Sequence, residues 1–293
     1  MVTLFRALAV LPLWLLHGIG VILGWVAYLG SPTYRRRFAD NARQAGYGLG
    51  QIRGAVASSG RLVAEAPRLW FGAAPRVLWS GAELIDAALA RGRGIVFLTP
   101  HLGCFEATAQ GYAGRFGPIT VLYRPARKAW LRPLVDGARA RHNLATAPTT
   151  LAGVKQMLKA LQAGQAVGLL PDQVPPDGLG VWAPFFGKPA YTMTLSARLA
   201  RQTGAAVLLA WGERLAWGRG YRIHLRAWPG EMPAEPQAAA TQVNAQIEAL
   251  IARRTVEHRR RLPAEWRLVG VIGDGETRKV GDVLAERERA LHL

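Results

Sequence analysis

The stretch Gly94–Gln110 reads Gly-Ile-Val-Phe-Leu-Thr-Pro-His-Leu-Gly-Cys-Phe-Glu-Ala-Thr-Ala-Gln, and it decides the expected fold. Its run Ile95–Leu98 is short, continuous and apolar, which is typical of a strand buried on both faces. Pro100 interrupts that run, and the residues after it suit the start of a helix. The stretch therefore predicts a buried strand, a tight turn and a helix in succession.

Similar apolar runs recur later in the chain, separated by segments with helical spacing. The strand-like runs lie at 119–123, 166–170 and 206–211, and an alternating, half-exposed strand is expected at 221–228. Helices are expected at 83–90, 151–161 and 192–203. This alternation predicts an α/β fold with a mostly parallel central sheet flanked by helices.

Three of the predicted strands end in polar residues, at His101, Arg124 and Asp172. Open α/β sheets bind their ligands at the carboxyl ends of the strands, so these residues are candidates for one active face. Glu106 follows His101 by five residues. If His101 lies on the turn and Glu106 in the first helical turn, the two side chains can meet, and a carboxylate in contact with an imidazole supports it as a general base.

The N-terminal segment 7–29 contains no Asp, Glu, Lys or Arg across 23 positions. About 20 apolar residues suffice to cross a bilayer, although Pro12 and three glycines leave a kinked or in-plane anchor open. Arg35, Arg36 and Arg37 follow directly, which places the body of the protein on the cytoplasmic side by the positive-inside rule. We therefore expect a membrane anchor over residues 1–30 and one catalytic domain over residues 31–293.

The charge balance points to anionic partners. The formal net charge is +18 and only five of the 37 basic residues are lysines. Arginine binds carboxylates and phosphates through two parallel hydrogen bonds, so phospholipid, phosphorylated glycolipid, an acidic carrier protein and nucleic acid all remain open. Cys104 is the only cysteine, which excludes intramolecular disulfides and cysteine-rich metal sites.

Several kinds of catalytic site are not supported. The sequence has no Gly-x-Ser-x-Gly elbow, no phosphate-binding P-loop, no dinucleotide fingerprint and no His-Glu-x-x-His motif. Neither a metal nor a cofactor is therefore expected. A histidine base without a protein nucleophile fits the direct attack of a substrate hydroxyl on an activated acyl group. A non-catalytic membrane protein that binds anionic lipid is the alternative from another class.

A set of motifs in fixed order resembles the lysophospholipid acyltransferase superfamily, and more narrowly the bacterial lipid A late acyltransferases, which transfer lauroyl or myristoyl groups. The first is Thr99-Pro100-His101-Leu102-Gly103-Cys104-Phe105-Glu106, similar to the family's His-x-x-x-x-Asp/Glu box. The others are Tyr123-Arg124-Pro125, Arg139-Ala-Arg141-His-Asn143, Pro171-Asp172-Gln173 and Pro184-Phe185-Phe186-Gly187-Lys188-Pro189-Ala190. The resemblance spans about residues 1 to 260, and the C-terminal segment departs from the family pattern.

The resemblance implies roles for the candidate residues. His101 would take the proton from an acceptor hydroxyl, Glu106 would orient His101, and backbone N–H groups near Gly103 would stabilise the oxyanion. Arg124, Arg139 and Arg141 would contact phosphate, and Asp172 would order those arginines. The fold implied is the glycerolipid acyltransferase fold.

The resemblance also implies the partners. The donor would be an acyl carrier protein, the acceptor a phosphorylated glycolipid, and the location the cytoplasmic face of a bacterial inner membrane with its anionic phospholipids. An acyltransferase of the same superfamily for a phosphatidylinositol mannoside or a lysophospholipid, using acyl-CoA, remains an alternative. The sequence does not favour nucleic acid as a partner.

Overall fold

The central sheet is built around β2 (Ile95–Leu98). The computed structural model describes residues 2–48, 50, 52–123 and 142–257. In spatial order, the seven strands are β1 (Val77–Ser80), β9 (Tyr221–Ala227), β8 (Ala206–Arg214), β2, β5 (Ala166–Leu169), β3 (Ile119–Tyr123) and β4 (Leu144–Pro148). Only the β8–β9 pairing is antiparallel, so the predicted α/β fold with a mostly parallel sheet is confirmed.

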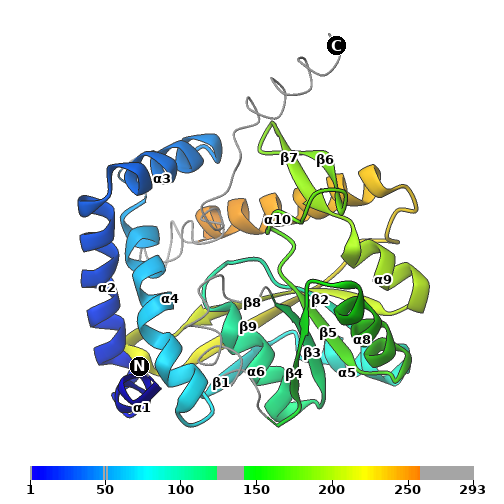
Figure 1. Cartoon of the computed structure of the whole chain (residues 1–293), viewed down its shortest axis with the longest axis horizontal. Helices are drawn as coiled ribbons and strands as arrows, with labels where there is room; N and C mark the ends of the chain where they lie inside the picture. Colours follow the sequence, from blue (N-terminus) through cyan, green and yellow to red (C-terminus); the bar gives the residue numbers. More distant parts are fainter. Residues whose placement is uncertain (1, 49, 51, 124–141, 258–293) are drawn as a thin grey trace.

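Helices cover both faces of the sheet and one of its ends (Figure 1). They are α1 (Val2–Ala9), α2 (Leu13–Gly30), α3 (Pro32–Gln44), α4 (Arg53–Phe71), α5 (Glu83–Ala90), α6 (Phe105–Arg115), α8 (Leu151–Gln162), α9 (Leu195–Thr203), α10 (Pro236–Glu257) and the short 3₁₀ turn η3 (Ala216–Gly218). The first four helices gather at one end of the sheet, and α8 and α9 lie at the other.

Side chains of β2 alternate between the two faces and define two cores. Ile95 and Phe97 belong to a cluster that includes residues of α5 and α6. Val96 and Leu98 belong to the larger cluster, to which α8, α9, α10 and the segment from α3 to α4 contribute. Because all four residues are buried, β2 is covered on both faces, as its continuous apolar sequence predicts.

A second, two-stranded sheet lies in a segment whose sequence has few regular signals. β6 (Gly180–Phe185) and β7 (Lys188–Met193) form an antiparallel hairpin. Phe186 and Gly187 make its turn, both at positive φ (46° and 73°). The helix expected at 192–203 begins only at Leu195, because Met193 still belongs to β7.

The expected N-terminal anchor folds as two helices that separate near Pro12. α2 is the one helix in the described part of the chain long and apolar enough to cross a membrane, with a mean hydropathy of 1.7. It packs along α4, where Gly20 and Gly24 of α2 meet Gly60 of α4 backbone to backbone. A Cβ atom at any of these three positions would collide with main-chain atoms, so the glycines set the distance between the two helices.

Candidate active site

His101 and Asp172 come together at the carboxyl end of the sheet. The two parallel strands that precede them, β2 and β5, are direct neighbours, and Thr99 N–H donates to the Leu169 carbonyl just beyond the last register pair. Asp172 binds His101 twice: its Oδ2 accepts from the backbone N–H at 2.8 Å, and its Oδ1 lies 2.9 Å from the imidazole Nδ1. The carboxylate therefore fixes both the backbone and the ring of His101.

This arrangement determines which ring nitrogen can act as a base. With Nδ1 directed at the Asp172 carboxylate, the neutral imidazole carries its proton on Nδ1, and Nε2 holds the lone pair. Gln173 Nε2 lies 3.5 Å from His101 Nε2, and the Phe105 ring packs edge-on against the imidazole with centroids 4.8 Å apart. His101 is thus a partly buried, oriented imidazole with the geometry of a general base.

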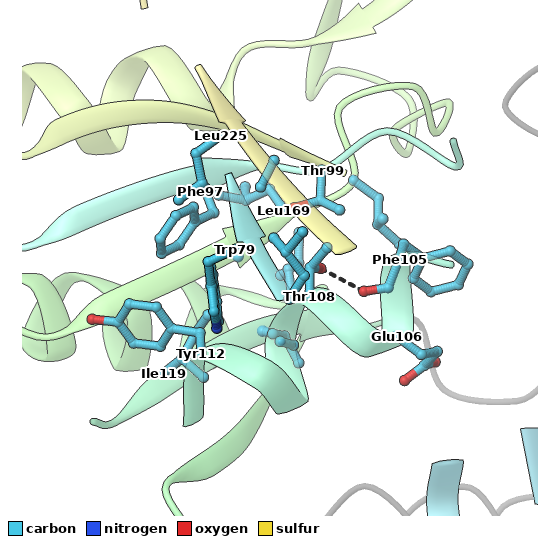
Figure 2. A pocket seen from close by; sticks show the side chains of 17 residues that line it. Trp79, Phe97, Thr99, Phe105, Glu106, Thr108, Tyr112, Ile119, Leu169 and Leu225 are labelled. Carbon is cyan, nitrogen blue, oxygen red and sulfur yellow. Dashed lines mark hydrogen bonds between the residues drawn. The ribbon is translucent and has the colours of Figure 1, made fainter. Parts of the chain in front are cut away.

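Glu106 lies in the first turn of α6, as its spacing from His101 predicts. It lines the cavity described below, where Figure 2 draws it beside Phe105. The Asp172 carboxylate contacts the backbone and the ring of His101, and the contact between Glu106 and His101 stays a prediction.

An apolar cavity opens between α6 and the sheet, next to Glu106. Figure 2 shows Phe105 and Glu106 at one end of it and Trp79 and Tyr112 at the other. Thr99, Glu106, Thr108 and Tyr112 carry side-chain oxygens on residues that line it. Apolar residues of the strands and of the segment just after β5 line the rest: Phe97, Ile119, Val121, Leu122, Leu169, Leu170, Ala210, Ile223 and Leu225. Gly168 on β5 leaves part of the wall without a side chain. The apolar lining suits hydrocarbon groups.

The turn after His101 is fixed to the neighbouring strand β8. Gly103 has φ of 73° and forms a parallel bridge with Gly212, and Cys104 N–H donates to the Gly212 carbonyl at 2.8 Å. The Cys104 amide is therefore already engaged and does not serve as a donor to an oxyanion. Burial raises the pKa of the Cys104 thiol well above its ordinary value, with the charge of Glu65 adding to the effect, so the thiol stays protonated and is no nucleophile.

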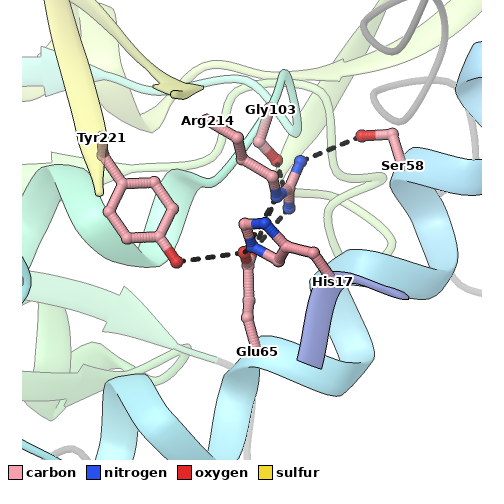
Figure 3. Close-up of polar contacts among 6 residues, drawn as sticks. All are labelled: His17, Ser58, Glu65, Gly103, Arg214 and Tyr221. Carbon is pink, nitrogen blue, oxygen red and sulfur yellow. Dashed lines mark hydrogen bonds and ion pairs between the residues drawn. The ribbon is translucent and has the colours of Figure 1, made fainter. Parts of the chain in front are cut away.

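A buried polar cluster that the sequence did not predict lies behind this turn (Figure 3). Glu65 of α4 is at its centre, fully buried, and accepts hydrogen bonds from Arg214 at the end of β8 through both carboxylate oxygens. His17 of α2 and the Tyr221 hydroxyl reach the same carboxylate at 2.9 and 3.0 Å. The cluster thus joins α2, α4 and the edge of the sheet.

Arg214 extends the cluster toward the active site. Its Nη1 donates to Ser58 at 2.9 Å and its Nη2 to the Gly103 carbonyl at 3.4 Å. Although burial alone would lower the pKa of Arg214, the charge of Glu65 raises it, so the guanidinium remains charged. Neither a periodic pattern nor a motif in the sequence predicts that Glu65 and Arg214 pair. The two residues are 149 positions apart, so the contact depends on the tertiary fold.

The remaining predicted site residues lie outside the described ranges. Arg124, Arg139 and Arg141 all fall in 124–141, so their contact with phosphate and the ordering of these arginines by Asp172 stay predictions. Within the described residues, no three His, Cys, Asp or Glu side chains converge on a point that would hold a metal ion.

Comparison with known proteins identifies the family. The model of the bacterial lipid A biosynthesis acyltransferase family matches residues 51–258, which include the His101 turn, the cavity and the Asp172 loop. The chain belongs to this family. The family is one of acyltransferases of lipid A biosynthesis.

Individual relatives are distant and differ in acceptor. The chain is 28% identical over 201 residues to the lipid A biosynthesis palmitoleoyltransferase of Escherichia coli, an alignment that covers 67% of this chain and 65% of that protein. It is also 28% identical over 197 residues to a phosphatidylinositol mannoside acyltransferase of Mycobacterium tuberculosis, with 64% and 57% covered. A lipid A biosynthesis acyltransferase of Haemophilus influenzae is 24% identical over 216 residues, with 70% and 60% covered.

Proposed function

We propose that this protein moves a fatty acyl group from an acyl carrier protein to a hydroxyl of a phosphorylated glycolipid of the lipid A precursor type. The observation that carries the proposal is the oriented imidazole of His101, held through Nδ1 by Asp172 and packed against Phe105, a residue that lines an apolar cavity. A base of this kind, without a protein nucleophile beside it, suits direct transfer between two substrates.

The chemical step follows from this geometry. His101 Nε2 takes the proton of the acceptor hydroxyl as its oxygen attacks the thioester carbonyl, which forms a tetrahedral intermediate. When the intermediate collapses, the carbon–sulfur bond breaks, the imidazolium returns the proton to the leaving thiolate, and an ester and a free thiol result. Asp172 holds the imidazole in the correct tautomer and stabilises the imidazolium through its negative charge.

Glu106 would assist His101 in one of two ways. It lies in the first turn of α6 and lines the cavity. There it supports the imidazole together with Asp172, or orients the acceptor hydroxyl toward Nε2. A backbone N–H group near Gly103 other than that of Cys104 would stabilise the oxyanion.

The acyl chain of the donor would occupy the cavity between α6 and the sheet. Its lining is mostly hydrocarbon, and polar side-chain groups come from Trp79, Thr99, Glu106, Thr108 and Tyr112. Burial of methylene groups supplies about 0.8 kcal/mol each, so a cavity of this lining binds acyl chains favourably. Thioester and hydroxyl would then meet at the carboxyl edge of β2.

Charge complementarity favours an acidic donor and an anionic acceptor. A protein with a net charge of +18 attracts a negatively charged acyl carrier protein and the phosphates of a glycolipid. Arg124, Arg139 and Arg141 are the proposed phosphate ligands. The site would work at the cytoplasmic face of the bacterial inner membrane, where such a donor is present.

A related acceptor is the second candidate, favoured by the similarity to a phosphatidylinositol mannoside acyltransferase at the same identity as the palmitoleoyltransferase. The two candidates are separated by assaying purified protein in mixed micelles with acyl carrier protein or CoA thioesters. The acceptors are a lipid A precursor, a phosphatidylinositol mannoside and a lysophospholipid. We expect transfer to the phosphorylated disaccharide from the carrier protein, and loss of transfer in His101→Ala. Transfer that survives His101→Ala would overturn the mechanism, and transfer to another acceptor alone would overturn the assignment of substrate.

A further inference from the structure

Helix α2 is apolar on two opposite sides, and protein covers only one of them. Its buried residues are Leu16, His17, Gly20 and Gly24. At about 100° per residue, the residues opposite this stripe form the outer face of α2, defined by Trp14, Ile22, Val26 and Leu29, whose exposed fractions are 59, 64, 61 and 63%. A surface helix of a protein that lies wholly in water carries polar residues in such positions.

The covered side holds α2 firmly on the domain. Backbone contact at Gly20, Gly24 and Gly60 leaves no space for side chains between α2 and α4. His17 and Glu65 join the two helices by a buried contact of 2.9 Å, and Glu65 is bound in turn to Arg214. Separation of α2 from α4 would therefore break the contact between His17 and Glu65 and expose the buried Glu65–Arg214 ion pair to solvent.

Helix α4 cannot follow α2 through a bilayer. Beside α2 it carries Arg61, Glu65 and Arg68, and its far end runs into β1 of the sheet. A span by α2 would bring these ionisable groups and part of the sheet to membrane depth, where they are strongly disfavoured. The length of α2 permits a span, but its packing does not.

We propose that the outer face of α2 lies flat in the interface of an anionic bilayer, so that the protein docks on one leaflet and does not cross the membrane. The inference rests on the proposed function for the choice of a lipid surface as the occupant. Its geometry is typical of an interfacial helix, whose apolar side enters the boundary between headgroups and acyl chains. Docking in this plane also fixes how the turn that carries His101 is oriented relative to the membrane, because Arg214 connects the α2–α4 pair to the neighbouring Gly103.

Neighbouring residues extend the outer face and supply charge for it. Val63 on α4 and Trp217 on η3 are exposed by 68 and 86%. Exposed arginines lie at both ends of the segment, at Arg6 and at 35–37. Apolar groups on the face and arginines around it match a surface of acyl chains and anionic headgroups.

Cysteine labelling from the two sides of the membrane tests the topology. Val10→Cys and Thr33→Cys place thiols just before and just after α2 at exposed positions, while the natural Cys104 is fully buried and gives the background in the parent protein. A membrane-impermeant maleimide is applied to intact spheroplasts and to inverted inner-membrane vesicles, and again after detergent. In-plane docking predicts that both positions react in inverted vesicles and neither in spheroplasts. Reaction from opposite sides, or reaction of neither until detergent is added, would overturn the proposal.

Vesicle binding tests the face itself. Ile22→Glu is compared with Leu151→Glu, a change of the same charge at a 72% exposed position on α8. In flotation with phosphatidylglycerol vesicles, we expect Ile22→Glu to weaken binding about tenfold and Leu151→Glu to leave it unchanged. Equal effects of the two variants on vesicle binding would reject a lipid occupant. So would a variant Ile22→Glu that binds vesicles normally but is a monomer where the natural protein is a dimer, because the face would then bind a second copy of the protein. Transfer activity in detergent micelles is measured in parallel, so that failure of docking is distinguished from failure of the proposed chemistry.

Discussion

Arg214 binds both carboxylate oxygens of Glu65 inside the protein, with Nε 3.1 Å from Oε1 and 2.9 Å from Oε2. Neither side chain reaches solvent: the exposed fractions of the two side chains are 2% and 0%. Glu65 lies on α4 and Arg214 at the end of β8, so this pair connects the helices beside the expected anchor to the strand that supports the Gly103 turn.

Removal of one member of this pair should destabilise the protein strongly. Glu65→Ala leaves the Arg214 charge buried without its partner, which costs about 3–5 kcal/mol of the free energy of unfolding. The matched control is Asp40→Ala, which removes the exposed pair between Asp40 and Arg43 at 2.8 Å and should cost less than about 1 kcal/mol. Urea denaturation measures the free energy of unfolding of both variants. Similar losses in the two would contradict the claim that burial makes the Glu65–Arg214 pair more important for stability than the exposed pair.

The same carboxylate should make stability depend on pH at the acidic end. Burial alone would raise the pKa of Glu65, but the charge of Arg214 and the hydrogen bonds from His17 and Arg214 outweigh it and lower the pKa to about 2. A folded-state pKa below the unfolded value means that the stabilisation is complete above pH about 4.5 and is lost as the pH falls toward 2. Its full size is about 3 kcal/mol.

Urea denaturation between pH 3 and 6 checks this dependence. The free energies of unfolding of the natural protein and of Glu65→Gln should converge as the pH falls through this range, because only in the natural protein does this side chain take up a proton when the chain unfolds. Parallel curves would show that Glu65 does not titrate in this way.

Variants of the two carboxylates near His101 should distinguish their roles. Asp172→Asn keeps the shape of the side chain but removes the charge that fixes Nδ1–H, so we expect kcat to fall by about 10²–10⁴ with little change in KM. Glu106→Gln tests the predicted dyad in the same assay. A larger loss of kcat in Glu106→Gln than in Asp172→Asn would assign the orienting role to Glu106.

The pH profile of kcat gives the second readout. Loss of a carboxylate that stabilises the imidazolium should move the acidic limb of the profile to lower pH, whereas a purely structural change would lower kcat at every pH alike. Thermal unfolding midpoints of both variants control for lost stability.

The sequence predicted the parts of the fold that depend on local pattern. Continuous apolar runs marked β2, β3 and β5 because strands covered on both faces need them. β1 and β4 were missed: Val77–Ser80 is half-exposed, and Leu144–Pro148 ends in a proline, so neither has the apolar run of a buried strand. Hairpin β6–β7 was missed for the same reason.

Prediction of the site was limited by strand order. His101 was singled out from its own neighbours in the sequence, whereas its contact with Asp172 depends on β5 lying beside β2, which adjacency in the chain does not reveal. The sequence therefore offered Glu106 as a partner of His101, which stays a prediction, and the family resemblance implied that Asp172 orders the arginines. Glu65 and Arg214 could not be paired at all, since their contact is made only when α4 packs at the end of the sheet.

Two glycine variants should measure how closely α2 is held. A Cβ at Gly60 would meet backbone atoms of Gly20 and Gly24, so Gly60→Ala forces the helices apart and should cost about 1–3 kcal/mol. Gly18→Ala is the control on the outer side of α2, where a Cβ meets nothing within 4 Å, and it should be neutral or stabilise by about 0.5–1 kcal/mol. Chemical denaturation measures both, and equal effects would contradict close helix packing.

Gly168 should limit the length of the acyl chain that the protein accepts. A Cβ at this position on β5 would lie 3.1 Å from Val121 Cγ1 and would project into the wall of the cavity. Gly168→Ala narrows the cavity, so the ratio of kcat/KM for a long to a short acyl donor should fall by about 10-fold, the size of one or two lost methylene contacts.

The double variant Gly168→Ala/Val121→Ala removes the opposing methyl groups and should restore the ratio toward that of the natural protein. The single variant Val121→Ala is its control and should favour longer donors. Competition between acyl donors of different length, with products separated by mass spectrometry, measures the ratio directly. An unchanged ratio in Gly168→Ala, with activity retained, would show that the acyl chain binds elsewhere than between α6 and the sheet.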